Sequence, residues 1–284
     1  MPSADRQNNG AIDSHGPEWR DWVYTNVGAG CDPDEMARRM VASGWTPASA
    51  REAIAFATAG QEGDGKAVAR PQLPAIGRWE FDGHGVTVTM RLEAPAVALC
   101  ENALSGEECA QLLAYAEHRG LQPSTVVDND DGRTRPHPER TSTGLMLSRA
   151  ETELVARIEH RLARLTAWPV ENGEGLQILR YGKGQEYRPH FDAFPDGMAA
   201  RVHCEHGGQR VNTVVVYLQS PERGGGTYFP NLGLTVRPQA GTAVIFHNVD
   251  AAGLRANETL HSGQPVEAGE KIILTYWQRE QAFG

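Results

Sequence analysis

Hydrophobic and polar positions change their period along this chain, and the change separates two regions. From Trp19 to Phe56 apolar residues recur at helical spacing. Asp32 or Asp34 is suited to cap one helix, and Ser43-Gly44 ends it before a second helix over residues 50–56. The pattern therefore predicts a small module of two or three helices near the N-terminus.

Composition sets the expected borders of that module. Residues 1–16 are polar and lack periodicity, which predicts a disordered tail. The module itself is expected over residues 17–60. Residues 61–77 combine glycine and proline with polar residues, as linkers do. A second, larger domain is then expected over residues 78–284.

The larger domain begins with both strand and helix patterns and continues with strand patterns alone. Residues 86–92 alternate apolar and polar, which indicates a half-buried strand. Ser105 is suited to start a helix, and residues 151–168 carry a second amphipathic helical pattern. Short β-rich runs separated by glycine and proline then follow: LQILRY, TVVVYL, TYFP, LTV, TAVIF and KIILTYW. This order predicts a mainly β fold with flanking helices (α+β), an antiparallel sandwich or barrel with the helices packed outside.

Charge and composition exclude some classes of function. The chain has 284 residues, with 36 acidic against 27 basic residues and a formal net charge of −9, so we expect no nucleic-acid partner. No apolar run approaches the roughly 18 residues of a membrane span, and the first residues are polar where a secretory signal is apolar. We expect no membrane association and a cytoplasmic protein. The four cysteines, at no repeated spacing, are expected to be reduced and mostly structural: Cys31, Cys100, Cys109 and Cys204.

The candidate chemistry lies in the β-rich region. His190 and Asp192 flank one residue in an extended segment, so their side chains point to the same face. With His261 they form the two-histidine, one-carboxylate set of non-haem Fe(II) oxygenases, which leaves positions for a bidentate 2-oxo acid and for dioxygen. Lys271 follows His261 by ten residues and would pair with the far carboxylate of such a co-substrate. Only three residues of the whole chain are lysine, which favours a specific role for this one.

The same stretch resembles a known family. Five segments, in family order, carry the resemblance: LQILRYGKGQEYRPHFDAF, GGQRVNTVVVYL, GGGTYFP, LTVRPQAGTAVIFHN and HSGQPVEAGEKIILTYW. They resemble the prolyl 4-hydroxylase branch of the 2-oxoglutarate/Fe(II)-dependent dioxygenases. A weaker match, VALCENALSGEECAQLLAYAE with Arg140-Thr141-Ser142, extends the resemblance to about residues 97–280.

The resemblance implies a role for each matching position. His190, Asp192 and His261 match the iron ligands. Lys271 matches the residue that pairs with the far carboxylate of 2-oxoglutarate, and the hydroxyls of Tyr181 and Thr227 match hydrogen-bond donors to that carboxylate. The positions that line the site of peptidyl proline near the metal are matched by three further residues: Tyr187, Arg210 and Trp277.

The resemblance also implies a fold and a reaction. The fold is a double-stranded β-helix, or jelly roll. The reaction is hydroxylation of an unactivated C–H bond, most simply of a prolyl residue in a peptide or protein, with Fe(II), 2-oxoglutarate and O2 consumed to give succinate and CO2. Some family members also use ascorbate, which this sequence does not test. A free amino acid or a small natural product stays open as the substrate, and the sequence leaves the oligomeric state open.

The chain departs from the family pattern at a few positions. Ile272 stands where tryptophan is frequent, and Gly226 stands where an acidic residue is common. Residues 197–208 differ from the expected sequence, and loops beside such sites select the substrate. Related halogenases vacate the carboxylate position, so Asp192 favours hydroxylation.

Structural interpretations stand beside these functional ones. The ligand and lysine positions could be solvated residues, and the site aromatics, Arg210 and Thr227 could be ordinary strand residues. The cluster over residues 203–206 contains histidine and cysteine but lacks zinc-finger spacing, so we interpret it as a polar loop. His247 is interpreted as a hydrogen-bonded core histidine, and the glycines at 224–226 as a turn.

The helical module leaves a second class of function open. Its run MVASGWTPASAREAIAF weakly resembles ubiquitin-associated-like three-helix domains, a spacing that any compact helical hairpin also shows. The alternative to an enzyme is therefore an inert jelly-roll scaffold whose module recognises partners. The complete set of His190, Asp192, His261 and Lys271 favours the enzyme.

Overall fold

The computed structural model describes residues 17–28, 31–62, 70–127, 134–136, 140–195, 202–250 and 253–284. The chain divides into two compact units, Met1–Val68 and Ala69–Gly284, which are described separately. The division falls inside the segment 61–77 that the sequence predicts as a linker. The expected disordered tail, residues 1–16, lies outside the described residues.

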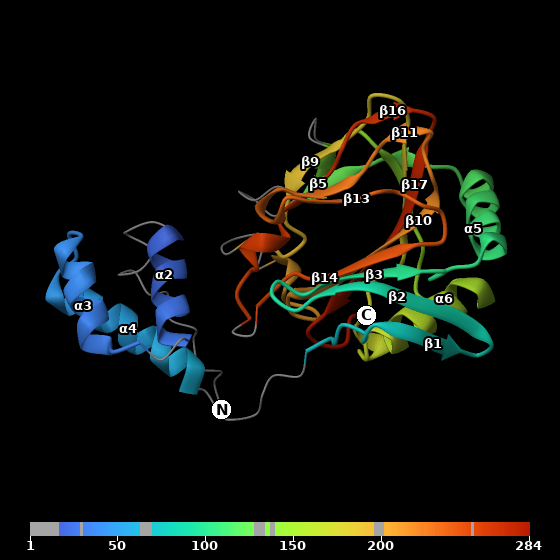
Figure 1. The fold of residues 1–284 in the computed structure, drawn as a ribbon. Coiled ribbons are helices and arrows are strands. Elements are labelled where there is room, and N and C mark those ends of the chain that lie inside the picture. Colours follow the sequence, from blue (N-terminus) through green and yellow to red (C-terminus); the bar gives the residue numbers. More distant parts are fainter. Residues whose placement is uncertain are drawn as a thin grey trace. The chain divides into compact units, whose positions relative to one another are not determined.

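The described residues of the first unit form three helices, α2 (Pro17–Gly28), α3 (Pro33–Ala42) and α4 (Pro47–Glu62) (Figure 1). Asp32 caps α3 by accepting the Asp34 backbone N–H at 3.1 Å, as its place before the helix predicts. Gly44 follows the helix end with φ of +103°, a conformation that side chains disfavour. The helices enclose a small core of their own: Val23, Met36, Met40, Trp45, Ala50, Ala53, Ile54 and Ala57.

The second unit is built on a nine-stranded antiparallel sheet (Figure 1). Many neighbouring strands in this sheet are not consecutive in the chain, because the chain forms other elements before it adds the next strand to the sheet. In sheet order the strands are β1 (Gly77–Phe81), β2 (His84–Leu92), β3 (Val97–Glu101), β14 (Ala243–His247), β10 (Arg210–Gln219), β17 (Lys271–Arg279), β8 (Gln177–Tyr181), β7 (Thr143–Met146) and β4 (Gln122–Pro123).

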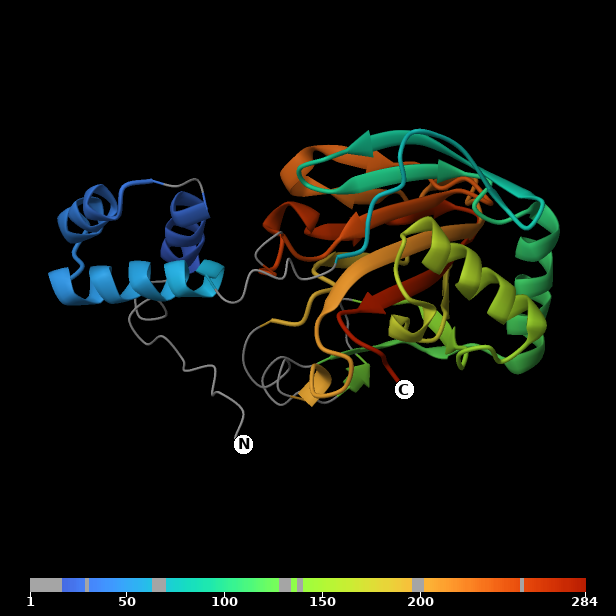
Figure 2. The same ribbon diagram turned by 90° about the horizontal axis from the view of Figure 1, so that it is seen from below.

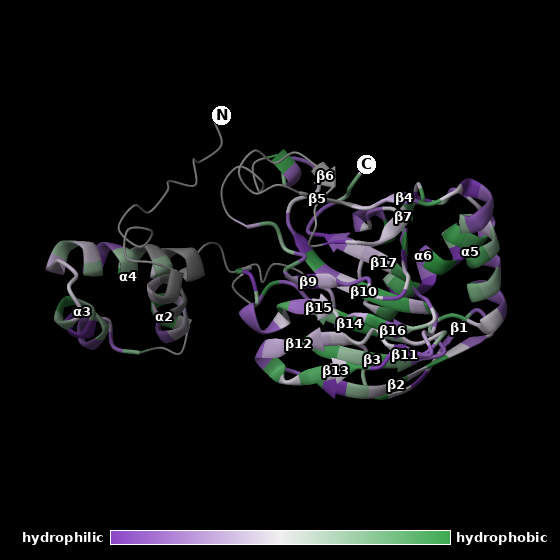
Figure 3. Ribbon diagram, turned by 90° about the horizontal axis from the view of Figure 1, so that it is seen from above, coloured by the Kyte–Doolittle hydropathy of each residue, from purple (hydrophilic) through white to green (hydrophobic). Residues whose placement is uncertain are grey.

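Two helices cover one face of this sheet, α5 (Gly106–Arg119) and α6 (Glu153–Leu165) (Figure 2). Ser105 and Glu108 form a capping box at the start of α5, which satisfies backbone N–H groups that the helix cannot pair itself. Thr152 caps α6. Apolar residues of both helices belong to one buried cluster with residues of the central strands, and Figure 3 colours these elements by hydropathy.

A four-stranded sheet faces the other side of the large one. Its order is β13 (Leu234–Val236), β12 (Thr227–Phe229), β15 (His261–Gly263) and β9 (Tyr187–His190). Aromatic and aliphatic residues from both sheets fill the space between them, with Tyr217, Phe229 and Phe246 fully buried. Two facing antiparallel sheets with flanking helices are the jelly-roll arrangement.

Two short two-stranded sheets complete the described strands. The first pairs β11 (Arg223–Gly224) with β16 (Val266–Ala268), and the second pairs β5 (Thr125–Val127) with β6 (Thr134–Pro136). Among the residues described, no helix combines the length and apolar character that crossing a membrane requires.

The residues just before β1 pack onto the second unit. Leu73 is buried in the core beneath the helices, and the Gln72 backbone N–H donates to the Thr166 carbonyl at 2.7 Å. Gln72 and Leu73, both within the predicted linker, are therefore packed as part of the second unit. All four cysteines are free, and Cys100 and Cys109 are buried.

Candidate active site

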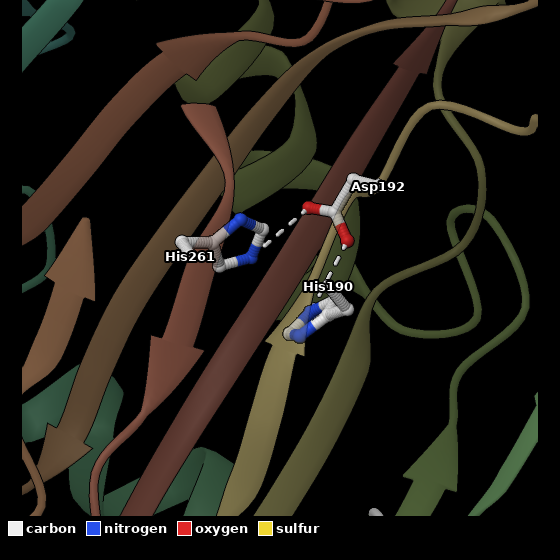
Figure 4. A group of neighbouring side chains, drawn as sticks. All are labelled: His190, Asp192 and His261. Carbon is white, nitrogen blue, oxygen red and sulfur yellow. Dashed lines mark ion pairs between the residues drawn. The ribbon is translucent and has the colours of Figure 1, made fainter. Parts of the chain in front are cut away.

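Three candidate metal ligands converge where the small sheet meets the chain that follows β9 (Figure 4). His190 ends β9 and His261 begins β15, and the two residues are directly paired in the antiparallel register. Asp192 follows β9 by two residues. His190 Nε2 lies 3.8 Å from Asp192 Oδ1, and His261 Nε2 lies 3.8 Å from Asp192 Oδ2. One ligand atom from each residue falls within 4.8 Å of the others, which fits coordination of a single ion.

Backbone carbonyls orient both imidazoles. His190 Nδ1 lies 2.8 Å from the Arg188 carbonyl, and His261 Nδ1 lies 3.0 Å from the Thr259 carbonyl. A carbonyl can only accept, so Nδ1 carries the proton and the Nε2 lone pair points to the common centre. Burial, and next the His261 imidazole, lower the pKa of His190 to about 3, which keeps it neutral and able to bind a metal.

Asp192 is held by a buried hydrogen-bond relay. The Thr213 hydroxyl donates to Asp192 Oδ2 at 2.7 Å, and the Asn248 amide donates to the Thr213 oxygen at 2.9 Å. Both residues are fully or almost fully buried. Burial raises the pKa of the Asp192 carboxyl, but the neighbouring histidines and other polar groups outweigh it, and the pKa lies below the usual value. The carboxylate is therefore charged and presents Oδ1 as its unshared oxygen.

Lys271 lies at the start of β17, directly paired with Tyr181 of β8. Its side chain is 2% exposed, its ammonium donates to the Gly225 carbonyl at 2.9 Å, and it lies 4.6 Å from the centre of the Tyr181 ring. Burial lowers the pKa of Lys271 to about 8. A buried ammonium with no carboxylate partner among the described residues suits an anionic ligand.

Thr227 of β12 lies beside a second buried hydroxyl. The Tyr217 phenol donates to the Thr227 oxygen at 2.7 Å, and burial raises the pKa of that phenol. Because the Thr227 oxygen accepts this bond, its own hydroxyl hydrogen is free to donate to a ligand.

Tyr187 packs directly on a metal ligand. Its ring stacks on His190 with centroids 3.5 Å apart, and the Arg140 guanidinium lies 4.9 Å from the Tyr187 ring centre. Burial raises the pKa of Tyr187 to about 12, so its phenol stays protonated at neutral pH.

Arg210 and Trp277 form one stacked unit on neighbouring strands. The Arg210 guanidinium lies 3.8 Å from the Trp277 ring centre, and its Nε and Nη2 donate to Glu174 at 2.6 and 2.7 Å. Arg279 Nε also donates to Glu174, at 2.7 Å. One buried carboxylate thus serves two arginines, so this cluster carries a net positive charge, and the Arg210 guanidinium is one of the groups that lower the pKa of Asp192.

Comparisons with known proteins can be set beside this geometry. The model of the 2OG-Fe(II) oxygenase superfamily matches residues 176–279. Probable prolyl 4-hydroxylase 7 of Arabidopsis thaliana is 37% identical over 214 residues, which cover 69% of this chain and 66% of that protein. Probable prolyl 4-hydroxylase 6 of the same plant is 35% identical over 227 residues, which cover 74% of this chain and 77% of the relative. The chain belongs to the prolyl 4-hydroxylase family of 2OG-Fe(II) oxygenases.

A solved structure agrees with that membership. The 2OG complex of a viral collagen prolyl hydroxylase from Paramecium Bursaria Chlorella virus-1 is 31% identical, with a TM-score of 0.52, and the match covers 64% of this chain and 94% of that one. As a family member the chain is a dioxygenase that uses Fe(II), 2-oxoglutarate and O2. The histidine and carboxylate set and the buried ammonium of Lys271 fit iron and 2-oxoglutarate respectively.

The structure also places the other candidates from the sequence: the cluster 203–206, the glycine turn and His247. Over the described part of the chain, the only group placed to hold a metal is the triad. In the cluster 203–206, the His203 ring stacks on Phe194 with centroids 5.0 Å apart, as in a packed loop. Gly225 approaches Lys271 in a turn with φ of +69°. His247 differs from its expected hydrogen-bonded state, because its Nε2 is buried without a hydrogen-bond partner and burial lowers its pKa to about 4.

Several residues that support the site in this family member were not found from sequence. They contact the predicted residues by a hydrogen bond, by a cation–π contact or through one further side chain: Glu174, Thr213, Tyr217, Arg140 and Asn248. Thr213 and Tyr217 did leave a signal, since each places a polar atom within an apolar, fully buried strand. Glu174 and Asn248 carry no such signal, because their hydrogen-bonding partners are distant in sequence.

Proposed function

We propose that this chain hydroxylates a prolyl residue within a peptide or protein, coupled to conversion of 2-oxoglutarate to succinate and CO2. The observation that carries the proposal is the metal triad with Tyr187 stacked on His190 and the Arg210–Trp277 unit nearby. The relatives, prolyl 4-hydroxylases and a collagen prolyl hydroxylase, support the same substrate class.

The protein's own groups divide the work of binding. His190, Asp192 and His261 would hold Fe(II), which activates O2 for C–H hydroxylation when 2-oxoglutarate is bound. Lys271 would pair with the far carboxylate of 2-oxoglutarate, and Thr227 would donate a hydrogen bond to it.

Aromatic faces support the prolyl side of the proposal. The Tyr187 and Trp277 rings are largely buried, and Trp277 Nε1 has no hydrogen-bond partner in the described protein. An apolar pyrrolidine ring fits against aromatic faces, and a buried indole N–H suits a peptide carbonyl as acceptor. We assign Tyr187, Arg210 and Trp277 to substrate positioning on this basis.

The first experiment tests the iron and 2-oxoglutarate site without any substrate. Metal-free protein is titrated anaerobically with Fe(II) and then with 2-oxoglutarate, and the visible charge-transfer band of the chelate is recorded. We expect the band in the natural protein and its loss in Asp192→Ala and His261→Ala. Absence of the band in well-folded natural protein would refute the cofactor assignment.

The second experiment tests the substrate. Proline-containing peptides, free proline and other free amino acids are each incubated with enzyme, Fe(II), 2-oxoglutarate and O2, with and without ascorbate. Substrate-dependent succinate and the gain of one oxygen in the product are measured by mass spectrometry. We expect hydroxylated peptide. Hydroxylation confined to free amino acids would move the substrate to the small-molecule class, and dependence on ascorbate would support its use as a reductant.

A further inference from the structure

The chain that follows the ligand Asp192 is held by a side chain rather than by a strand. The Phe194 backbone N–H donates to Gln209 Oε1 at 2.8 Å, and Gln209 Nε2 donates to the Phe194 carbonyl at 2.9 Å. A hydrogen-bonded residue pair in an antiparallel ladder exchanges the same two bonds. The Gln209 carboxamide therefore takes the place of a neighbouring strand at this point, two residues after Asp192.

Gln209 is itself fixed just before β10. Its Oε1 also accepts the Arg210 backbone N–H at 2.9 Å, so two N–H donors and one carbonyl allow a single orientation of the carboxamide. Its backbone N–H donates to Glu280 Oε2 and its carbonyl accepts the Glu280 N–H, both at 3.0 Å. Gln209 thus joins the segment after Asp192 to the first residue of β10.

The Phe194 ring supports the arginine assigned to substrate positioning. The Arg210 guanidinium lies 4.8 Å from the centre of the buried Phe194 ring and 3.8 Å from that of Trp277. Against burial, the two ligand histidines and then Arg210 lower the pKa of the Asp192 carboxyl, so the guanidinium lies within electrostatic reach of the metal ligands. Because a cation–π contact depends on the distance to the ring, a displaced Phe194 would loosen Arg210 at the site.

Other hydrogen bonds hold the two groups that Gln209 connects. Thr213 donates to the Asp192 carboxylate, and Glu174 accepts from the Arg210 guanidinium. Each of these bonds fixes one group by itself. Gln209 adds a link between them, so its loss should change the place of Arg210 relative to Asp192 more than the state of either group.

We propose that Gln209 is a positioning residue for the peptide substrate: it holds the Phe194 peptide so that the Phe194 ring keeps Arg210 in place beside the metal ligands. This inference rests on the proposed prolyl hydroxylation and on the role given there to Arg210. Loss of the Gln209 contacts should weaken peptide binding and leave Fe(II) and 2-oxoglutarate binding unchanged. No side chain assigned to either of them is hydrogen-bonded to the Gln209 carboxamide in the described part of the chain.

The test uses Gln209→Met, which keeps the length of the side chain and removes the hydrogen bonds of its carboxamide. For the proline-containing peptide that the natural protein hydroxylates, KM should rise about tenfold and kcat should stay within about threefold. A misplaced peptide lets 2-oxoglutarate be consumed without hydroxylation, so succinate formed per hydroxylated peptide should also rise. The Kd values for Fe(II) and 2-oxoglutarate, from the anaerobic chelate band, should stay within about twofold.

A conservative variant and a control make the effect specific. Gln209→Glu keeps an oxygen for both N–H groups but lacks the donor to the Phe194 carbonyl, so its peptide KM should lie between those of the natural protein and Gln209→Met. Gln111→Met makes the same change at an exposed glutamine of α5, whose side chain donates to Glu107. It should leave the peptide KM and the succinate ratio unchanged.

A double-mutant cycle tests whether Gln209 acts through Phe194. Phe194→Leu removes the aromatic face from Arg210 and should raise the peptide KM about 5- to 30-fold. In that background Gln209→Met should change KM by less than about twofold, because residues that act through one contact are not additive. Full multiplication of the two effects would show that Gln209 does not act through Phe194 and would overturn the proposal.

The remaining outcomes distinguish this inference from the proposed function. A peptide KM and a succinate ratio in Gln209→Met equal to those of Gln111→Met would overturn the role of Gln209 and leave prolyl hydroxylation standing. Loss of the chelate band in both Gln209 variants would also overturn it, because the residue would then be needed for the metal site itself. If the natural protein forms the band and hydroxylates no peptide, prolyl hydroxylation of peptides fails, and this inference fails with it.

Discussion

Thr213 is the residue that fixes the orientation of the proposed carboxylate ligand. Its hydroxyl donates to Asp192 Oδ2 and leaves Oδ1 for the metal. Thr213→Val keeps the side-chain shape but removes the donor, so the buried carboxylate loses a charge-assisted hydrogen bond. We expect the Kd for Fe(II) to rise about 10- to 100-fold, as measured by anaerobic titration, because the partners of metal ligands contribute to affinity on that scale.

Two further variants make the role of Thr213 specific. Thr213→Ser retains the hydroxyl and should restore most of the affinity. Thr166→Val removes another buried threonine hydroxyl, one that accepts from Gln278 at 2.8 Å away from the triad, and should leave the iron Kd unchanged. An unchanged Kd in Thr213→Val would show that Asp192 does not need this donor.

Lys271 should make 2-oxoglutarate binding dependent on pH. Burial lowers its pKa to about 8, so in the free enzyme the ammonium is charged below that pH and neutral above it. The carboxylate of 2-oxoglutarate pairs with the charged form only, so its Kd should be constant below pH 7 and should rise by about tenfold per unit above pH 8. The measurement is the chelate titration repeated from pH 6.5 to 9.5.

Neighbouring groups do not produce the same profile. The pKa of His190 is about 3 and that of Tyr187 about 12, both outside this window. Arginine stays charged throughout, so Lys271→Arg should bind 2-oxoglutarate with a Kd that is weaker but flat between pH 7 and 9.5. A rising Kd in that variant would assign the titration to another group.

At the scale of elements, the pairing of β15 with β9 assembles the site. His261 pairs with His190 and Gly263 with Tyr187, with a register shift between the two pairs, and this pairing places two ligands and a stacking ring together. A slip by one residue would turn His261 to the other face. Gly263 is needed for a different reason, because a Cβ there would lie 3.2 Å from Lys271 Nζ.

We therefore expect Gly263→Ala to weaken 2-oxoglutarate binding without unfolding the protein. The methyl group would displace the ammonium by a few tenths of an ångström, and the Kd for 2-oxoglutarate should rise about three- to tenfold, as for one weakened hydrogen bond. Gly106→Ala is the control, since a Cβ there meets nothing within 4 Å. A Kd in Gly263→Ala equal to that of the control would exclude this contact as a determinant of affinity.

The elements that sequence predicted best are those whose signals are local. The cap at Ser105 and the apolar runs of β10 and β17 have strong patterns, and the structure places α5 and both strands there. Strands β9 and β15 have only four and three residues, too few for periodicity to register. Their pairing depends on contacts between residues about seventy positions apart, which a single sequence does not display.

The same distinction holds for the candidate site. His190 and Asp192 could be proposed as neighbours because their spacing is local. The structure brings His261 to them as the resemblance implied. By contrast, Glu174 meets Arg210 and Arg279 only because β10 and β17 are adjacent in the sheet, and a lone glutamate before a strand carries no sign of that.

At the scale of the whole molecule, each unit has its own hydrophobic core. The helices of the first unit bury Met40 and Trp45, while the sheets of the second bury Tyr217 and Phe246. The proposed iron and 2-oxoglutarate residues all belong to the second unit. The chemistry assigned above therefore requires only residues 69–284.

We expect a chain shortened to residues 69–284 to fold and to bind its co-substrate as the full chain does. Its core lacks no side chain of the first unit, so its Tm should stay within about 2 °C of the corresponding transition of the full chain, and the 2-oxoglutarate Kd should be equal. Calorimetry and the anaerobic titration measure the two quantities. A Tm lower by more than about 5 °C would show that the helices stabilise the catalytic unit. Equal Tm and Kd with slower hydroxylation of a large protein, but not of a short peptide, would assign the helices to substrate docking.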